Sequence, residues 1–220
     1  MAAEADVTAI TDVLQFIGVF VSFSIAYVAF RGLKQTQSSA LLRLTTAFTF
    51  LGFGFMVQAL VGLEGVIPIL PALTTTMIAG LAVAGALMET AGYFFLAFSH
   101  ALDVMFSRKL GVALLIFPIV TMSAAQTTDV LSILSFYFIL YGVLETAYAY
   151  SRTRKPDTLV IATGLALLGV GTLVAWFSLL YPEVYVLSLV QIIIKETGLM
   201  ILFIPVLSYA LGGTRTNGPI

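Results

Sequence analysis

The sequence predicts an all-α polytopic membrane protein, a single bundle of seven transmembrane helices. First, the 220-residue chain is 60% hydrophobic and only 10% charged, with a mean hydropathy of +1.08. A soluble domain carries about 25% charged residues. Second, apolar segments suited to crossing a bilayer as helices recur along the chain. Third, basic residues gather on alternate connections between these segments. Residues 1–220 therefore form one transmembrane domain, with no room for a soluble one.

Seven apolar segments can be delimited in order. The predicted spans are 11–30, 41–63, 76–99, 110–124, 130–150, 159–180 and 186–211. The connections between them are brief, so consecutive helices should be antiparallel neighbours. The fourth segment is the shortest and contains Pro118, a residue that disrupts helix interiors.

Charge on the connections predicts the orientation. Every Lys and Arg except Lys195 follows the first, third, fifth or seventh span: Arg31, Lys34, Arg43, Arg108, Lys109, Arg152, Arg154, Lys155 and Arg215. By the positive-inside rule the amino terminus is outside and the carboxyl terminus is cytoplasmic. The acidic amino terminus lacks the basic start of a signal peptide, so we expect it to be retained. These ends suit a prokaryotic cytoplasmic membrane.

Composition also excludes several classes of function. A net charge of -1 argues against nucleic acid as a partner. Without Cys there are no disulfides, iron–sulfur clusters or thiolate metal sites. His100 and Asp103 alone are too few ligands for a metal site. No catalytic motif is found, so we expect neither an enzyme nor a metalloprotein.

The last span carries a polar centre, Lys195 and Glu196, with Gln191 one turn before Lys195. A charge in the middle of a membrane helix costs about 2.5–3.5 kcal/mol, so these groups need partners. Glu89 lies near the middle of the third span. Lys195 could form a buried ion pair with Glu89 or Glu196, which would set helix register without adding much stability. Alternatively, an amine in an apolar pocket could form a Schiff base.

A second polar pattern follows the third span. Glu89, Tyr93, Leu96, His100 and Asp103 follow one another at steps of three or four residues and so share one helix face. Carboxylate, phenol and imidazole in series could relay protons, as such rows do in pumps and transporters. The alternative is structural: a Glu paired with Lys195, a Tyr bonded within the bundle, and a His at the water interface.

A third pattern lies on the fifth span, where Tyr137, Tyr141, Glu145 and Tyr148 share a face. This face could line an aromatic pocket for a quinone, polyene or lipid. We favour the alternative, a polar seam between helices, because a row of Tyr suits any helix junction.

The layout resembles the microbial rhodopsin family: seven spans, an outside amino terminus, short loops, and a mid-membrane Lys and carboxylate in the last and third spans. The resemblance implies retinal as cofactor, held by Lys195 as a protonated Schiff base with Glu89 as counterion. Gln191 would take the place of the family's second acid. Gly85 stands where the family has an Arg, and the third span lacks the family's Trp, while Trp176 lies late in the sixth.

Our leading functional expectation is a non-catalytic membrane protein, a small subunit or transducer within a larger membrane complex. The chain has no soluble domain, short loops and Gly- and Ala-rich helix faces that could meet a membrane-protein partner or a second copy. One alternative is a retinal-binding photoreceptor or pump. Another is a proton-coupled transporter or channel, which would need a water-filled route to Glu89 or Lys195.

Overall fold

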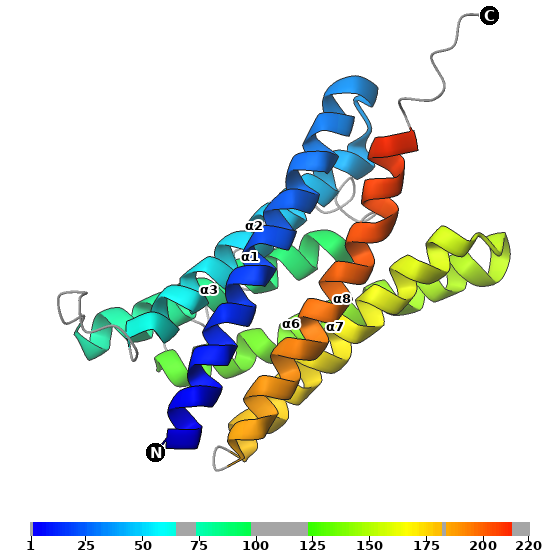
Figure 1. The fold of residues 1–220 in the computed structure, drawn as a ribbon. Helices are drawn as coiled ribbons and strands as arrows, with labels where there is room; N and C mark the ends of the chain where they lie inside the picture. The colour runs from blue at the N-terminus through cyan, green and yellow to red at the C-terminus, as the bar shows by residue number, and fades with distance from the viewer. Residues whose placement is uncertain (1, 65–73, 98–122, 182–183, 213–220) are drawn as a thin grey trace, which may run out of the picture.

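A computed structural model describes residues 2–64, 74–97, 123–181 and 184–212. These ranges form six helices: α1 (Ala2–Thr36), α2 (Ser39–Glu64), α3 (Thr75–Ala97), α6 (Ala124–Thr153), α7 (Pro156–Leu180) and α8 (Tyr185–Gly212). All six are long and apolar enough to cross a membrane. Figure 1 shows them as one elongated bundle. The chain is therefore a multi-pass membrane protein, as its sequence predicts.

The predicted number of spans is wrong. Over the described ranges there are six membrane-length apolar helices, not seven. The fourth predicted segment, 110–124, is shorter than the roughly 20 residues that a helix needs to cross the hydrocarbon, and it contains Pro118. Apart from its last two residues, where α6 begins, that segment lies outside the described residues.

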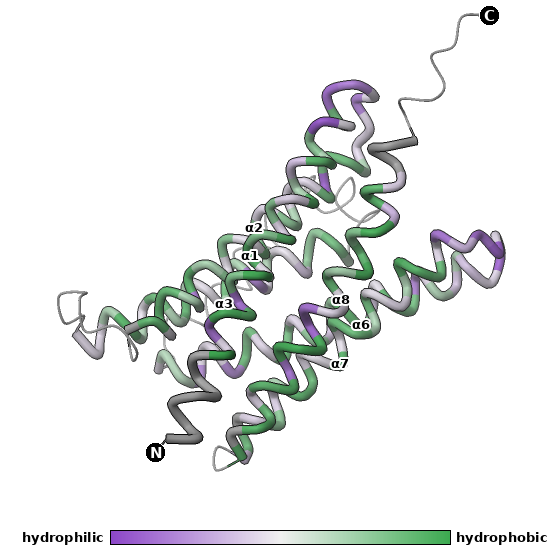
Figure 2. The backbone as a smooth tube through the Cα atoms, in the orientation of Figure 1, coloured by the Kyte–Doolittle hydropathy of each residue, from purple (hydrophilic) through white to green (hydrophobic). Residues whose placement is uncertain are grey.

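Local signals place the helix ends around the α6–α7 hairpin. Ser123 caps α6 by accepting a hydrogen bond from the backbone N–H of Gln126, whose side chain bonds back to Ser123. Arg154 ends α6 in the left-handed conformation, with φ 54°. Pro156 then starts α7, where its missing N–H costs nothing. The hairpin is therefore tight, and its polar residues stand out in Figure 2 together with those of the α1–α2 turn.

The helices pack in a closed ring in the order α1, α2, α3, α6, α7, α8, so that α8 also contacts α1. Two junctions in this ring are parallel. In α3 and α6, Thr90 bonds to Ser135, and Ala97 lies against Gly142 further along both helices. The α1–α8 junction is parallel in the same way, whereas the other four are antiparallel. Helices α1, α3, α6 and α8 therefore point one way, and α2 and α7 the other (Figure 1).

The two halves of the ring, α1–α3 and α6–α8, pack in matching register. In each half the second and third helices approach closely at two places, separated by two helical turns along both helices. These contacts are Gly54 with Gly85 and Ala47 with Gly92 in the first half, and Gly171 with Gln191 and Gly164 with Gly198 in the second. By this register α2 corresponds to α7, and α3 corresponds to α8.

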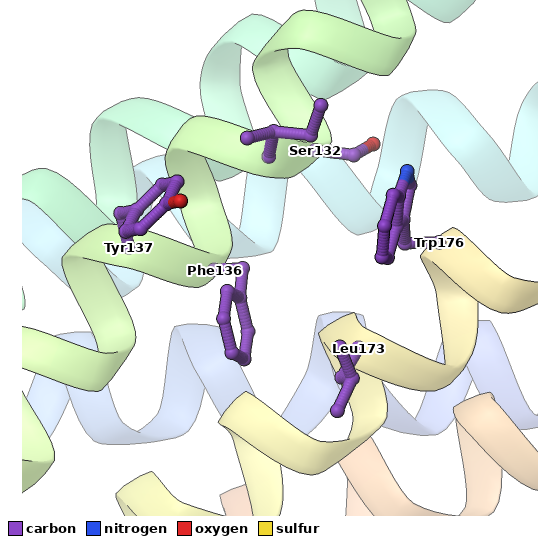
Figure 3. A pocket seen from close by; sticks show the side chains of 6 residues that line it. Ser132, Phe136, Tyr137, Leu173 and Trp176 are labelled. Atoms are coloured by element: carbon purple, nitrogen blue, oxygen red, sulfur yellow. The ribbon is translucent and has the colours of Figure 1, made fainter.

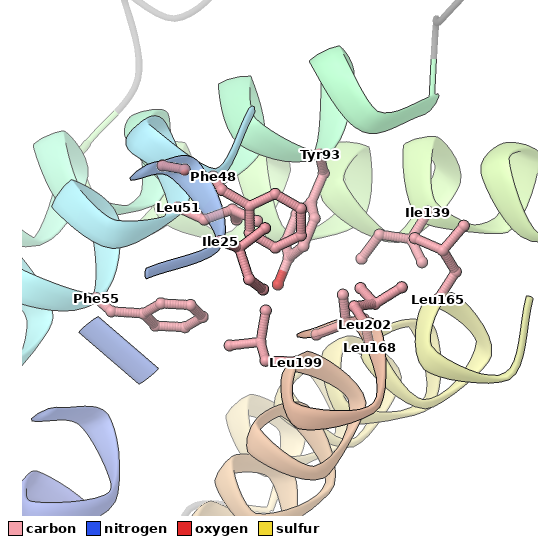
Figure 4. Close-up of a cluster of buried hydrophobic side chains, with 11 residues drawn as sticks. Ile25, Phe48, Leu51, Phe55, Tyr93, Ile139, Leu165, Leu168, Leu199 and Leu202 are labelled. Atoms are coloured by element: carbon pink, nitrogen blue, oxygen red, sulfur yellow. The ribbon is translucent and has the colours of Figure 1, made fainter. Parts of the chain in front are cut away.

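An apolar core closes the middle of the ring. Its buried members come from all six helices and surround Tyr93, whose hydroxyl points into the cluster (Figure 4). They are Ile25, Ala26, Phe48, Leu51, Phe55, Tyr93, Ile139, Leu165, Leu168, Leu199 and Leu202. Many other large apolar side chains are exposed on the outside of the bundle, as expected where lipid is the solvent.

Candidate functional site

Glu89 of α3 and Lys195 of α8 form a buried ion pair. The Lys195 Nζ lies 2.5 Å from Glu89 Oε1, and the two side chains are 11% and 9% exposed. This confirms the pair that the sequence predicts, with Glu89 and not Glu196 as the partner. A buried charge of either sign would be costly alone, so each group holds the other in place.

Two further side chains complete the hydrogen bonding of Glu89. Gln58 of α2 donates from Nε2 to Glu89 Oε2 at 2.8 Å. Tyr93, one turn along α3, donates from its hydroxyl to Glu89 Oε1 at 2.9 Å and is fully buried. Both carboxylate oxygens are thus satisfied by donors from three helices, which orients this group within the membrane.

Glycines allow these helices to approach the pair. A Cβ at Gly54 of α2 would lie 3.0 Å from the backbone nitrogen of Glu89. A Cβ at Gly171 of α7 would lie 2.6 Å from the Lys195 side chain. The absence of a side chain at both positions therefore brings α2 against Glu89 and α7 against Lys195.

The other two members of the predicted polar centre lie apart from the ion pair. Glu196 points about 100° away from Lys195 round α8 and faces α1, where its carboxylate lies against Gly18. Gln191 is one turn from Lys195, at the α7–α8 contact. Glu196 Oε2 and Gln191 Oε1 are both buried without a hydrogen-bond partner.

Asp12 is a buried acid that the sequence did not identify as part of a site. It lies near the predicted outer end of the first span, where an acid ordinarily meets water. In the structure it is 5% exposed and lies against Gly62 of α2. The available signal was its spacing from Gln15 and Ser22, which places all three on one helix face.

Buried acids outnumber buried bases inside the described part of the bundle. The buried ionisable side chains there are three acids and one base: Asp12, Glu89, Glu196 and Lys195. Lys195 pairs with Glu89, so no buried Lys or Arg among the described residues neutralises Asp12 or Glu196.

The predicted proton row is described only at its beginning. Glu89 and Tyr93 are joined by the 2.9 Å hydrogen bond. His100 and Asp103 lie outside the described residues, so the continuation of the row stays a prediction.

The tyrosine row of the fifth predicted span lies on the exposed face of α6. Tyr137, Tyr141 and Tyr148 are 61%, 48% and 58% exposed, and Glu145 is half-buried. Tyr148 packs against the guanidinium of Arg152, 4.6 Å from its ring centre. These four side chains do not enclose a common pocket within the bundle.

Tyr137 does line a separate apolar cavity between α6 and α7 (Figure 3). Its volume is about 250 Å³. The lining residues are Ser132, Ile133, Phe136, Tyr137, Leu173 and Trp176. Leu173 lies two residues beyond Gly171, which contacts Lys195. A second cavity of about 300 Å³ lies among all six helices, on the side of the core toward the α1–α2 turn.

Fold and site together define a multi-pass membrane protein with a buried Glu–Lys centre. Comparisons of the chain with protein-family models, curated proteins and solved structures find no match. What the centre can do chemically is therefore inferred from its side chains.

Proposed function

We propose that the protein translocates protons, as a proton-coupled transporter or channel centred on Glu89 and Lys195. The observation that carries this proposal is the ion pair at mid-bundle, bonded directly to the buried phenol of Tyr93. Ionisable groups inside a membrane are expensive, and where they occur they typically form ion pathways or proton relays. Stability alone gives little reason to keep such a pair, because apolar side chains can fill the same space at lower cost.

The chemistry follows from the contact between the two groups. A proton can pass from Lys195 Nζ to Glu89 Oε1 without an intervening water, because the two atoms are 2.5 Å apart. Neither residue lines the two cavities described above, so the water-filled route that a transporter needs must open during transport. The N–H bond breaks, an O–H bond forms, and two neutral groups replace the ion pair. Neutral groups cost less to hold in an apolar environment than separated charges do. Tyr93 bonds to the same oxygen, so Glu89 connects the amine with the phenol.

Proton flux into liposomes tests this proposal. Purified protein is reconstituted with a pH-sensitive dye inside, and a potassium diffusion potential drives protons inward. We expect faster acidification than in protein-free liposomes, and its loss in Glu89→Gln. Asp157→Asn, which changes an exposed acid in the first turn of α7, should keep the wild-type rate. A wild-type rate equal to that of protein-free liposomes contradicts the proposal.

Retinal binding is the second candidate, supported by one observation. Lys195 is paired with the acid of α3 that the rhodopsin resemblance designates as counterion. In that case Lys195 would hold the aldehyde as a Schiff base, and Glu89 would balance its charge. Adding all-trans retinal should produce a visible absorption band that is absent in Lys195→Ala. Absence of the band in the wild type excludes this candidate.

The expectation of a subunit or transducer within a larger complex stays a prediction. The exposed apolar faces of the described helices suit lipid and protein partners equally well. Extraction in mild detergent followed by native mass spectrometry should recover a partner in fixed stoichiometry. Recovery of a stable monomer alone argues against this expectation.

A further inference from the structure

The buried polar atoms without partners lie on two neighbouring helices of the bundle. Within the described residues, six buried side-chain oxygens have no hydrogen-bond partner, and all belong to α1 or α8. They are Thr11 Oγ1, Asp12 Oδ2, Gln15 Oε1, Ser22 Oγ, Gln191 Oε1 and Glu196 Oε2. An unsatisfied buried polar group costs about 1–3 kcal/mol. Asp12 faces α2 and Gln191 lies at the α7–α8 contact, whereas the Glu196 carboxylate lies between α8 and α1 and indicates that a partner belongs at that junction.

Three of these oxygens belong to residues on or opposite the face of α1 that contains Gly18. The Glu196 carboxylate lies directly in front of Gly18, because a Cβ built there would overlap it. Gln15 and Ser22 lie about one turn to either side of Gly18 on the same face of α1. Glu196 is 4% exposed and Ser22 is 0% exposed. A carboxylate, an amide and a hydroxyl without partners therefore lie within two turns of α1 at its junction with α8.

The matching junction in the other half of the ring is already satisfied. By the register of the two halves, Thr90 of α3 corresponds to Glu196 of α8. Thr90 and Ser135 are joined by a 2.9 Å hydrogen bond between their hydroxyls. Ser22 lacks even the bond to the carbonyl four residues earlier that Thr90 and Thr172 make. The α1–α8 junction therefore contains buried polar groups without hydrogen-bond partners, whereas Thr90 and Ser135 at the α3–α6 junction bond to each other.

The chemistry of the three groups selects the partner. All three present oxygen, the donor atom that hard cations prefer. Lys195 is bonded to Glu89, so Glu196 needs another cation to balance its charge when it loses its proton. Divalent ions usually take more than one carboxylate or keep several waters, whereas one carboxylate with two neutral oxygens balances a single positive charge.

We propose that Glu196, Ser22 and Gln15 bind a sodium ion between α1 and α8. Among the described residues no three His, Asp or Glu side chains gather as a metal site, so this site differs from a zinc or calcium centre. Asp12 and Thr11 lie further along α1 toward the amino terminus, and each has a buried oxygen without a hydrogen-bond partner. Sodium binding at this site does not use the ion pair of Glu89 and Lys195, so it goes beyond the proposed function and can stand without it.

Thermal unfolding in different salts tests the site on the whole protein. The melting temperature is measured in detergent in choline, potassium and sodium chloride at one ionic strength. We expect a saturable rise with sodium that choline and potassium do not produce, and its loss in Glu196→Gln and Ser22→Ala. Asp157→Asn should keep the rise. Equal melting temperatures of the wild type in all three salts overturn the proposal.

A glycine variant tests the position of the proposed sodium ion without removing any of its three ligand side chains. In Gly18→Ala the new methyl group must push the Glu196 carboxylate aside. The sodium midpoint, the concentration that gives half of the rise in melting temperature, should therefore increase about tenfold or more. Gly80→Ala is the matched control, because no atom lies within 4 Å of the added Cβ. An unchanged midpoint in Gly18→Ala overturns the placement of the ion.

Infrared spectroscopy of the wild type separates sodium from a proton and needs no variant to fold. If sodium binds at Glu196, a protonated carboxylic-acid band should be present in choline and decrease on addition of sodium. The same band at equal intensity in both salts means that a proton fills the site, which overturns the proposal.

Discussion

Glu89 of α3 and Lys195 of α8 occupy corresponding positions in the two halves of the bundle and bond to each other. Glu89 lies one turn after Gly85, which contacts Gly54. Lys195 lies one turn after Gln191, which contacts Gly171 in the same register. The ion pair therefore links the two three-helix halves. It can form because the first half has an acid, Glu89, at the position where the second half has an amine, Lys195.

Breaking this pair should destabilise the fold. Lys195→Met leaves the Glu89 carboxylate buried without its countercharge, and the expected loss is about 3–5 kcal/mol. Adding Glu89→Leu removes the stranded charge, so the double variant should regain most of that loss. Unfolding followed by circular dichroism in detergent measures both. A single variant as stable as the wild type would show that the pair carries no structural role.

Removing the Tyr93 hydroxyl should reduce proton flux more than it reduces stability. Tyr93→Phe loses one hydrogen bond to a charged group, worth about 1.5–3 kcal/mol, while the ion pair remains. We expect the acidification rate of liposomes to fall at least several-fold. Thr90→Val removes another buried hydroxyl of α3, away from Glu89, and should keep the rate. Equal rates in both variants would exclude Tyr93 from the path.

Close backbone contact between α7 and α8 makes Gly198 sensitive to substitution. A Cβ there would lie 2.8 Å from the carbonyl oxygen of Gly164 and 3.0 Å from the backbone nitrogen of Leu168. Backbone atoms cannot rotate away, so Gly198→Ala must separate the helices, at a cost of about 1–3 kcal/mol. Gly80→Ala meets open space and should leave the melting temperature unchanged or slightly higher. Equal melting temperatures in the two variants would contradict this packing.

Orientation in the membrane can be tested with single cysteines, because the chain contains none. Ser39→Cys and Thr153→Cys lie at the basic α1–α2 and α6–α7 turns, which we predict to be cytoplasmic. In intact cells they should resist a membrane-impermeant maleimide, whereas Ala125→Cys at the start of α6 should react. The reverse labelling pattern would place the amino terminus in the cytoplasm.

The membrane class and the ion pair could both be predicted from the sequence. Apolar segments of this length have few other stable environments, and an amine in the middle of one must find an acid. The number of spans could not be predicted from composition, because 110–124 resembles the other segments in composition but is shorter than they are. Composition identifies apolar segments, whereas crossing a bilayer also requires about 20 helical residues.

Which groups meet across helices could not be predicted, because periodicity describes one helix at a time. Tyr137 and Tyr141 do share a face of α6, but that face is exposed. Asp12 is buried only because α2 approaches it at Gly62. Glu196 turns to α1 rather than to Lys195, since α1 offers space at Gly18. Each of these facts depends on the packing of a second helix.

The central claim is that the Lys195 amine is held inside the membrane by Glu89. Lys195 is one of four lysines, so ¹⁵N-lysine labelling in lipid bilayers gives a simple solid-state NMR spectrum. With ¹³C-labelled glutamate, the Lys195 ¹⁵Nζ signal should be dephased by a directly contacting carboxyl carbon, and the dephasing should vanish in Glu89→Leu. A Lys195 signal that exchanges freely with bulk water and shows no carboxyl contact would contradict the account.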